Sequence, residues 1–193
     1  MKKTLVILAA LLLVFSSCSV KPKYHGMHGE KTQMDAEAEF VSALTTADST
    51  SVLELADKFM QTLQAGEVEE ALDMIYVLYY DKIFKKSAAF TEDLVGRFKA
   101  FPVRDYELVY YSFSTQGNND ISYKYAFGPA NASGQRPTIK LMLNPVLVDG
   151  VWYLTLKMAG QSSKDLPKDK QIHDYAPAPE DIVVYVKPES AKN

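Results

Sequence analysis

Hydrophobic and polar residues alternate with helical spacing between Ser51 and Gly66. Ser51 and Glu54 stand three residues apart, as in a capping box, and Gly66 is the residue type that most often ends a helix. Between them, the apolar positions are Val52, Leu55, Ala56, Phe59, Met60 and Leu63. This pattern predicts an amphipathic helix that buries one face.

Three more segments have helical periodicity. A second helix is predicted directly after Gly66, with an apolar face made of Val68, Ala71, Leu72, Ile75, Tyr76, Tyr79 and Ile83. A third is predicted over residues 91–100, with Thr91 as N-cap and with Leu94, Val95 and Phe98 buried. Residues 35–45 have weaker periodicity and indicate a leading helix. Asp57 and Asp73 are expected on the outward faces of their helices.

After Pro102 the pattern changes to strands that are rich in tyrosine and valine. Residues 106–115 and 121–127 flank a cluster of turn residues and predict an antiparallel hairpin. A second hairpin is predicted from residues 138–148 and 151–158, which are joined at Asp149-Gly150. Helices followed by a meander of about four strands predict an α+β fold over residues 35–160, with the helices packed on one sheet face.

The polar, proline-containing sequence from residue 161 to 193 is predicted to form a tail outside the core. Within this tail, residues 182–186 are apolar. We expect them either to add an edge strand or to dock on a partner.

The first seventeen residues have the pattern of an export signal. Lys2 and Lys3 precede an unbroken apolar run over residues 5–15, and two serines lie directly before Cys18. The run is too short to span a bilayer, which takes about 20 helical residues. A buried helix is the alternative, but such a helix should have a polar face and this run has none. Residues 18–34 are polar and aperiodic, which is typical of a flexible tether.

The residues Phe15-Ser16-Ser17-Cys18 resemble a lipobox, the signal read by lipoprotein signal peptidase. Phe15 replaces the usual leucine, and such a loose box is similar to those of Bacteroidota lipoproteins. The resemblance implies a thioether-linked diacylglycerol on Cys18, usually with an amide-linked third chain, which anchors a protein firmly to a membrane. Surface-exposed lipoproteins of that group carry an acidic cluster after the cysteine. Residues 19–23 are basic instead, so the resemblance favours the outer membrane facing the periplasm.

Composition narrows the functional classes. The chain has 193 residues and a formal net charge of −3, which becomes −5 if Lys2 and Lys3 leave with the signal. Nucleic-acid binding is not expected because the chain lacks a basic surplus. A single cysteine excludes an intramolecular disulfide and a cysteine-rich zinc site. His25 and His28 lie on the tether and His173 in the tail, so neither a metal site nor a cofactor is predicted.

Two segments combine packing and turn residues: Ala56-x-x-Phe59-x-x-x-Leu63-x-x-Gly66-x-x-x-x-Ala71-Leu72 and Val148-Asp149-Gly150-Val151-Trp152-Tyr153-Leu154. With helices preceding strands, they resemble the nuclear-transport-factor-2-like superfamily of cystatin-like α+β rolls, and within it small single-domain lipoproteins. The resemblance covers residues 51–157 and implies a curved sheet wrapped over the helices, forming a cone that often contains a pocket. Another α+β scaffold would also suit these segments.

Enzymes that resemble this superfamily place aspartate, histidine or tyrosine inside the cone. The residues expected to point inward here are aromatic: Tyr76, Tyr79, Tyr123, Tyr125 and Trp152. A tyrosine with a pKa near 10 is a poor base at neutral pH without a perturbing partner, and the sequence indicates none. Core or rim packing is therefore preferred over ligand binding, and no catalytic residue is predicted.

Two surface features complete the predictions. Tyr106, Leu108 and Tyr110 alternate along one strand with Val109, Tyr111 and Phe113, so both faces are apolar. The outer face is expected either to form a homodimer or to be covered by the third helix or the tail. Asp48-Ser49-Thr50 resembles the O-glycosylation acceptor of Bacteroidota periplasmic proteins, with Ser49 as acceptor; the alternative is an ordinary turn at a helix start.

The expected function is a membrane-anchored binding or accessory module of the cell envelope, with a small molecule or a protein as ligand. The alternative is a small envelope enzyme, of isomerase, dehydratase or hydrolase type, that uses the pocket tyrosines with a carboxylate.

Overall fold

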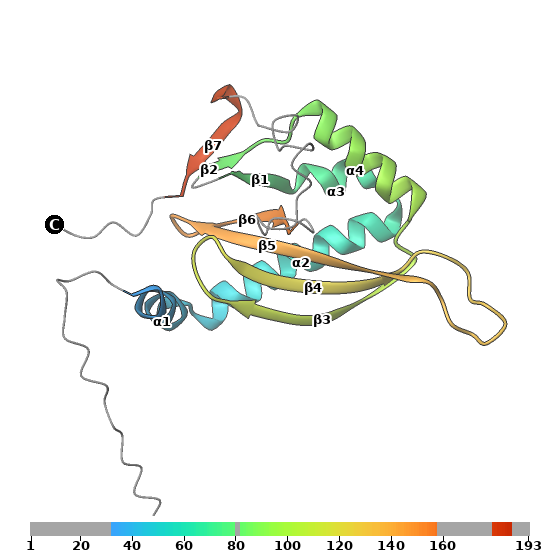
Figure 1. Ribbon diagram of the computed structural model, residues 1–193, viewed down its shortest axis with the longest axis horizontal. Helices are drawn as coiled ribbons and strands as arrows, with labels where there is room; N and C mark the ends of the chain where they lie inside the picture. Colours follow the sequence, from blue (N-terminus) through green and yellow to red (C-terminus); the bar gives the residue numbers. More distant parts are fainter. Residues whose placement is uncertain (1–31, 80–81, 158–178, 187–193) are drawn as a thin grey trace, which may run out of the picture. The chain divides into compact units, whose positions relative to one another are not determined.

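The computed structural model describes residues 32–79, 82–157 and 179–186 (Figure 1). Helices occupy the first part of this region and strands most of the rest. The predicted signal (residues 1–17), Cys18, nearly all of the tether and most of the tail lie outside the described residues. The α+β class, with helices packed on a curved and open sheet, is confirmed.

Helix α2 (Thr46–Ala65) is the predicted amphipathic helix, but it begins earlier than Ser51. Its N-cap is Thr45, which donates its backbone N–H to Asp48 Oδ2 (2.9 Å) and accepts from the Asp48 N–H (3.1 Å). Ser51 lies inside the helix and donates to the Asp48 carbonyl oxygen, so the predicted box at Ser51 was wrong. Gly66 ends the helix in the left-handed conformation, as predicted.

Helices α1 (Gln33–Ala43) and α4 (Ala88–Ala100) also differ from the predictions at their starts. A Thr32–Asp35 capping box begins α1. The N-cap of α4 is Ser87, whose hydroxyl oxygen accepts from the Phe90 N–H (3.2 Å). Thr91, the predicted cap, is already helical and donates its hydroxyl to the Ser87 carbonyl. The predicted inward face is present, because Leu94 and Phe98 are buried.

The second predicted helix is much shorter than its periodicity indicated. Helix α3 (Val68–Asp73) ends before Met74, and the chain continues as β1 (Ile75–Tyr79) and β2 (Lys82–Phe84). The run Ile75–Tyr79 is rich in aromatic and β-branched residues, which favour strands. It also finds partners on both sides, parallel to β6 and antiparallel to β2. Tertiary pairing therefore overrides the helical spacing, and Tyr76 and Tyr79 lie on a strand.

The predicted four-stranded meander forms β3 (Asp105–Phe113), β4 (Asn119–Ala126), β5 (Thr138–Val148) and β6 (Val151–Leu156). Asp149 and Gly150 both have positive φ, as a tight β5–β6 hairpin requires. Strands β1, β2 and β7 (Ile182–Tyr185) extend the sheet to seven strands in the order β3-β4-β5-β6-β1-β2-β7. The sheet thus has two edges, with β3 at one and β7 at the other.

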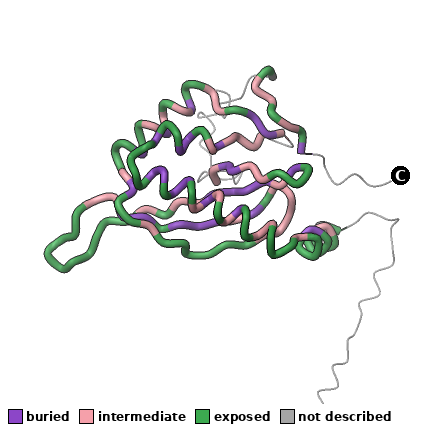
Figure 2. The backbone as a smooth tube through the Cα atoms, turned by 180° about the vertical axis from the view of Figure 1, so that it is seen from behind, coloured by how far each residue is buried: buried purple, intermediate pink, exposed green. Residues whose placement is uncertain are grey.

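Buried residues occur along both the helices and the strands (Figure 2). Their side chains form two clusters, one on each face of the sheet. The larger cluster lies between the helices and the inner face, and it includes Phe59 and Met60 of α2 and Ile75 of β1. On the opposite face, Ile83 and Val146 are fully buried in a smaller cluster, to which Tyr76 belongs. Neighbouring residues of β1 alternate between the clusters, as strand geometry demands. We call the face that carries the helices the inner face.

The two glycines of the helical region should respond in opposite ways to alanine. At Gly66, φ is +87° and no atom lies within 4 Å of an added Cβ, so Gly66→Ala should lower the free energy of unfolding by about 1 kcal/mol through backbone strain alone. Gly96 lies within α4 and is equally open, so Gly96→Ala should raise it by about 0.5–1 kcal/mol. Urea unfolding of both variants measures the difference; equal effects would contradict the assigned cap.

Candidate functional site

The structure separates the five aromatic residues that were expected to point inward. Tyr76 lies on the face opposite the helices, with its ring centroid 5.2 Å from that of Tyr153. Tyr79 ends β1 and pairs with the ring of Phe84 at 6.4 Å. Tyr123 and Tyr125 belong to the main core and are 2% and 4% exposed. Tyr76 therefore shares no space with the tyrosines of β4.

Trp152 is partly buried on the inner face of β6. Its ring lies 5.8 Å from that of Phe113, and within the described part of the chain its buried Nε1–H has no hydrogen-bond acceptor. As the chain's single tryptophan, it provides a fluorescent reporter of packing at this end of the sheet.

The space between α2 and the sheet is filled by side chains. Phe59 of α2 and Ile121 and Leu143 of the sheet are fully buried there, together with Tyr123 and Tyr125. A close-packed interior of this kind has few voids larger than a water molecule. The side chains in this region therefore form a core.

One carboxylate does meet a tyrosine at the border of this core. The Tyr106 hydroxyl of β3 donates to Asp57 Oδ1 of α2 (2.8 Å), and Gln61 Nε2 donates to Asp57 Oδ2 (2.6 Å). The Tyr106 ring packs edge-on against Tyr123, with centroids 5.7 Å apart. Asp57 was expected to point outward, and this prediction was wrong.

The sequence did contain a signal for this contact. Asp57, Gln61 and Gln64 follow one another at spacings of four and three on α2, so they form a row beside the apolar face. Gln64 Nε2 donates to the Arg104 carbonyl just before β3 (3.0 Å). The row therefore ties α2 to the start of β3.

The surroundings keep these tyrosines protonated. Partial burial raises the pKa of Tyr106 to about 12, and the hydrogen bond to Asp57 and the negative charge of Asp57 add to the effect. The pKa of Tyr123 is also raised, mainly by burial and then by Asp57 and Tyr106, and burial raises that of Tyr125. A protonated phenol donates hydrogen bonds but cannot serve as a base near neutral pH.

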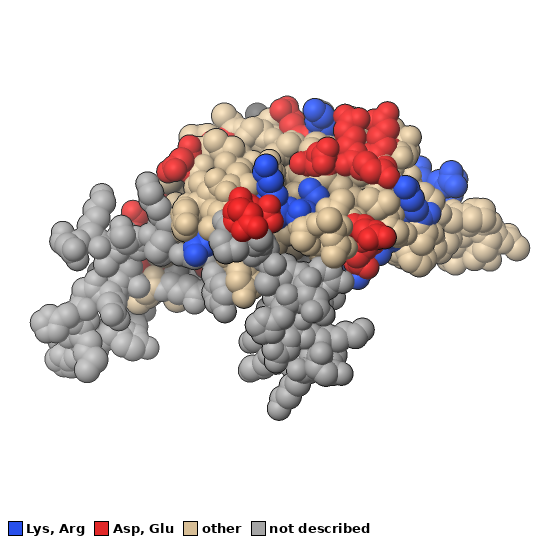
Figure 3. Space-filling view, turned by 90° about the horizontal axis from the view of Figure 1, so that it is seen from above, with Lys and Arg blue, Asp and Glu red and all other residues tan. Residues whose placement is uncertain are grey.

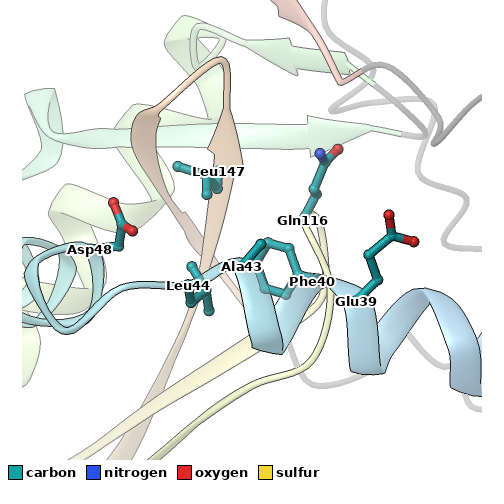
Figure 4. Close-up of a pocket in the computed structure, with 7 residues that line it drawn as sticks. All are labelled: Glu39, Phe40, Ala43, Leu44, Asp48, Gln116 and Leu147. Carbon is teal, nitrogen blue, oxygen red and sulfur yellow. The ribbon is translucent and has the colours of Figure 1, made fainter.

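A shallow hollow of about 230 Å³ lies beside α1 (Figure 4). Apolar side chains of α1, its C-cap and β5 line it, and Glu39, Asp48 and Gln116 supply the polar groups. The pKa of Asp48 is lowered by its hydrogen bonds from the Thr45 side chain and backbone. Asp48 is thus already engaged in capping α2, which limits what it can offer a ligand.

Ser49, the candidate glycosylation acceptor, lies in the first turn of α2. Its hydroxyl donates to the Thr45 carbonyl oxygen (3.3 Å), and the residue is partly exposed. The Asp48-Ser49-Thr50 segment therefore has helical backbone, and its glycosylation stays a prediction.

Two buried asparagines hold the loop that follows β3. Asn119 Nδ2 donates to the Pro145 carbonyl (2.7 Å), and Asn119 Oδ1 accepts from the Ser114 N–H (2.9 Å). Asn144 Oδ1 accepts from the Asn119 N–H (2.8 Å), while its Nδ2 donates to the Gly117 carbonyl (3.0 Å). Buried amides with satisfied hydrogen bonds specify one arrangement. The end of β3 is therefore held against β5.

Within the part of the chain that the structure describes, strand β3 carries the largest exposed group of apolar residues. Leu108, Val109, Tyr110 and Tyr111 are 43%, 51%, 39% and 50% exposed, and we call these four residues the β3 strip. The pairing with β4 shifts between Leu108 and Tyr110, which marks a β-bulge at Val109. After the bulge, Tyr111 pairs with the inward-pointing Ile121, and Tyr110 pairs with Ser122. Tyr111 therefore lies on the inner face with Tyr106 and Leu108, and the predicted alternation of side chains along β3 was wrong at this point.

Charged side chains are interspersed on the face that carries α4 (Figure 3). Lys99 pairs with Glu69 at 2.8 Å and Arg97 with Asp93 at 2.9 Å, and these pairs are largely exposed. Such pairs contribute little to stability. This face therefore presents no uniform field to a highly charged partner.

Metal and membrane features can be assessed only for part of the chain. Over residues 32–79, 82–157 and 179–186, no three His, Cys, Asp or Glu side chains are grouped so that they could hold a metal ion. No helix in these ranges combines the length and apolarity needed to cross a membrane. His25, His28, His173 and Cys18 lie outside them.

Comparisons with known proteins give one structural similarity. No protein-family model matches the chain, and no curated protein matches it. A solved structure from Campylobacter jejuni, described as an NTF2-like transpeptidase, is 16% identical, with a TM-score of 0.32. The match covers 54% of this chain and 96% of that one.

The Asp57–Tyr106 contact predicts an alkaline loss of stability. Because the folded-state pKa of Tyr106 is raised, the unfolded chain ionises first, near pH 10. The stabilisation is complete below pH 10 and is lost as the pH rises through about 12. Tyr106→Phe should cost about 1 kcal/mol at pH 7, a low value because the pair is partly exposed.

Urea unfolding at pH 7 and at several values above pH 10 tests this. The difference between wild type and Tyr106→Phe should shrink as the pH rises from about 10 to about 12. A constant difference would show that folding does not raise the pKa of Tyr106.

Proposed function

We propose that this protein is a membrane-anchored lipoprotein of the cell envelope that works as a binding or accessory module, with the β3 strip as its contact surface. Lipid on Cys18 provides the anchor, and the outer membrane facing the periplasm is the proposed location. The described domain presents the strip to a protein partner.

The exposure of the β3 strip supports this proposal most directly. Leu108, Val109, Tyr110 and Tyr111 are consecutive residues of one edge strand, with side chains on both faces, and each is more than a third exposed. Adjacent exposed apolar residues of this kind mark interaction sites, and tyrosine is enriched in protein interfaces. The inner face, where an enzyme of this shape would hold its substrate, is packed with side chains.

The enzymatic alternative has less support. Asp57 and Tyr106 are the carboxylate and tyrosine that meet, but both carboxylate oxygens already accept hydrogen bonds. The raised pKa of Tyr106 also removes it as a base at neutral pH. The hydrogen bond between these two side chains links α2 to β3 and has a structural role.

The anchor can be tested by membrane fractionation and intact mass. The wild-type chain should begin at Cys18, carry two or three acyl chains and sediment with the outer membrane. Cys18→Ala should lose the lipid and leave the membrane fraction, because the remaining domain has no comparable apolar anchor among its described residues. An unmodified, soluble wild-type chain would reject the anchor. The same mass measurement tests glycosylation of Ser49.

The contact surface can be tested by photo-crosslinking in intact cells. A photoreactive phenylalanine in place of Tyr111 should give a discrete protein adduct, because position 111 lies in the strip. The matched control replaces Tyr185, which is 56% exposed on the opposite edge strand, and it should give much less adduct. Equal labelling at both positions, or none at position 111, would count against the proposed surface.

A further inference from the structure

Strand β3 is an open edge of the sheet. It pairs with β4 on one side, and no strand among the described residues pairs with it on the other side (Figure 1). It is nine residues long, whereas the strand at the opposite edge, β7, has four. An edge strand presents backbone N–H and C=O groups that another strand can pair with.

We infer that the occupant of this edge is β3 of a second copy of the chain. The two strands pair antiparallel, and the two-fold axis that relates them passes through Tyr111. The inference rests on the proposed function and names the partner of the proposed surface. It assigns the contact to the sheet edge and gives it a defined register.

The second half of β3 lacks features that usually protect an edge. Residues 109–113 read Val-Tyr-Tyr-Ser-Phe and contain no charged residue and no proline. Natural proteins prevent unwanted pairing at an edge strand by placing lysine, proline, inward-pointing charges or β-bulges in that strand. The protective features of β3 are the acidic residues of its first half and the bulge at Val109, and the four residues after the bulge pair regularly with β4.

The acidic residues of β3 exclude a two-fold axis in the first half of the strand. A two-fold axis through Glu107 would place its carboxylate opposite its own copy, and an axis through Tyr106 would place Asp105 opposite Glu107. Like charges directly opposite one another destabilise strand pairs. An axis through Leu108 brings the irregular Val109 opposite Glu107.

The second half allows one long, uncharged register. A two-fold axis through Tyr111 places this residue opposite Tyr111 of the second copy. Tyr110 then lies opposite Ser112 of the second copy, and Val109 lies opposite Phe113 at each end of the paired segment. Opposed residues then point to the same face, since Tyr110 and Ser112 pair with the outward Ser122 and Asp120 of β4. An axis through Ser112 would be shorter, because the Ser114 N–H is already bonded to Asn119.

Two existing contacts position the tyrosines of this register. Lys140 Nζ lies 5.2 Å from the Tyr110 ring centroid on the outer face, and the Tyr111 ring lies 5.6 Å from that of Phe113 on the inner face. Aromatic pairs across antiparallel strands are favourable. Copies anchored in one membrane would also meet at a high effective concentration, which helps a small interface.

A single-cysteine scan in intact cells tests the register. The full chain is expressed with Glu107→Cys, Val109→Cys, Tyr111→Cys or Phe113→Cys and is then oxidised. Only residue 111 faces its own copy, within the range that a disulfide can bridge, so Tyr111→Cys should give about fivefold more linked dimer than Glu107→Cys. Wild type, with Cys18 as its single cysteine, reports any linkage through that residue.

The outcomes separate the inference from the proposed function. A dimer peak at position 111, with a linked 111–111 peptide by mass spectrometry, supports the inference. A photo-adduct at Tyr111 with a different protein, and no disulfide dimer, overturns the second copy but leaves the binding function in place. No adduct and no dimer reject both.

Sedimentation of the purified lipidated chain in detergent supplies an independent measurement. Tyr111→Lys should weaken self-association by about tenfold or more, because two ammonium groups would face each other across the axis. Val183→Lys on the opposite edge is 38% exposed and should associate as wild type. Thermal unfolding checks that both variants fold, and unchanged association of folded Tyr111→Lys would overturn the inference.

Discussion

The packing of α2 against the inner face of the sheet determines the rest of the structure. Val52, Ala56, Phe59 and Met60 have no exposed surface, and the strands that curve around them supply an equally buried set of side chains. A buried cluster of this kind contributes most of the favourable free energy of a small domain. The same packing determines which strands are covered. Helix α2 covers the middle strands, whereas β3 lies at an edge of the sheet where no described strand pairs with it.

Sequence patterns predicted the elements whose signals are local. The β5–β6 hairpin needs two residues with positive φ, and Asp149-Gly150 supplies them. The predicted start of α2 was wrong because Thr45 and Asp48 form a capping box six residues before the similar pair at Ser51. The prediction of a helix over β1 was wrong because the apolar residues of this segment fit both the helical and the strand period, and its partner β6 lies far along the chain. Long-range pairing decided that assignment.

The candidate site was harder to predict for two physical reasons. Asp57 lies on the flank of the apolar helix face, so only the position of β3 in space reveals that its carboxylate meets the Tyr106 hydroxyl. In β3 itself, one extra residue at Val109 exchanges the faces of Tyr110 and Tyr111. Single-sequence periodicity assumes an unbroken strand, and a bulge has no reliable signature. The aromatic composition of the strand was therefore predictable, whereas its facing was not.

A packed interior and an open edge are linked consequences of one arrangement. Tyr123 and Tyr125 are buried under the helix, so a ligand at that position would have to displace these two rings. Meanwhile the hydrogen bond from Tyr106 and the asparagine-bound loop hold both ends of β3 in place. A strand fixed at both ends loses little conformational freedom when its exposed edge pairs, and such preorganisation favours association. The proposed binding at β3 therefore depends on the same packing that fills the described core beneath the helix with side chains.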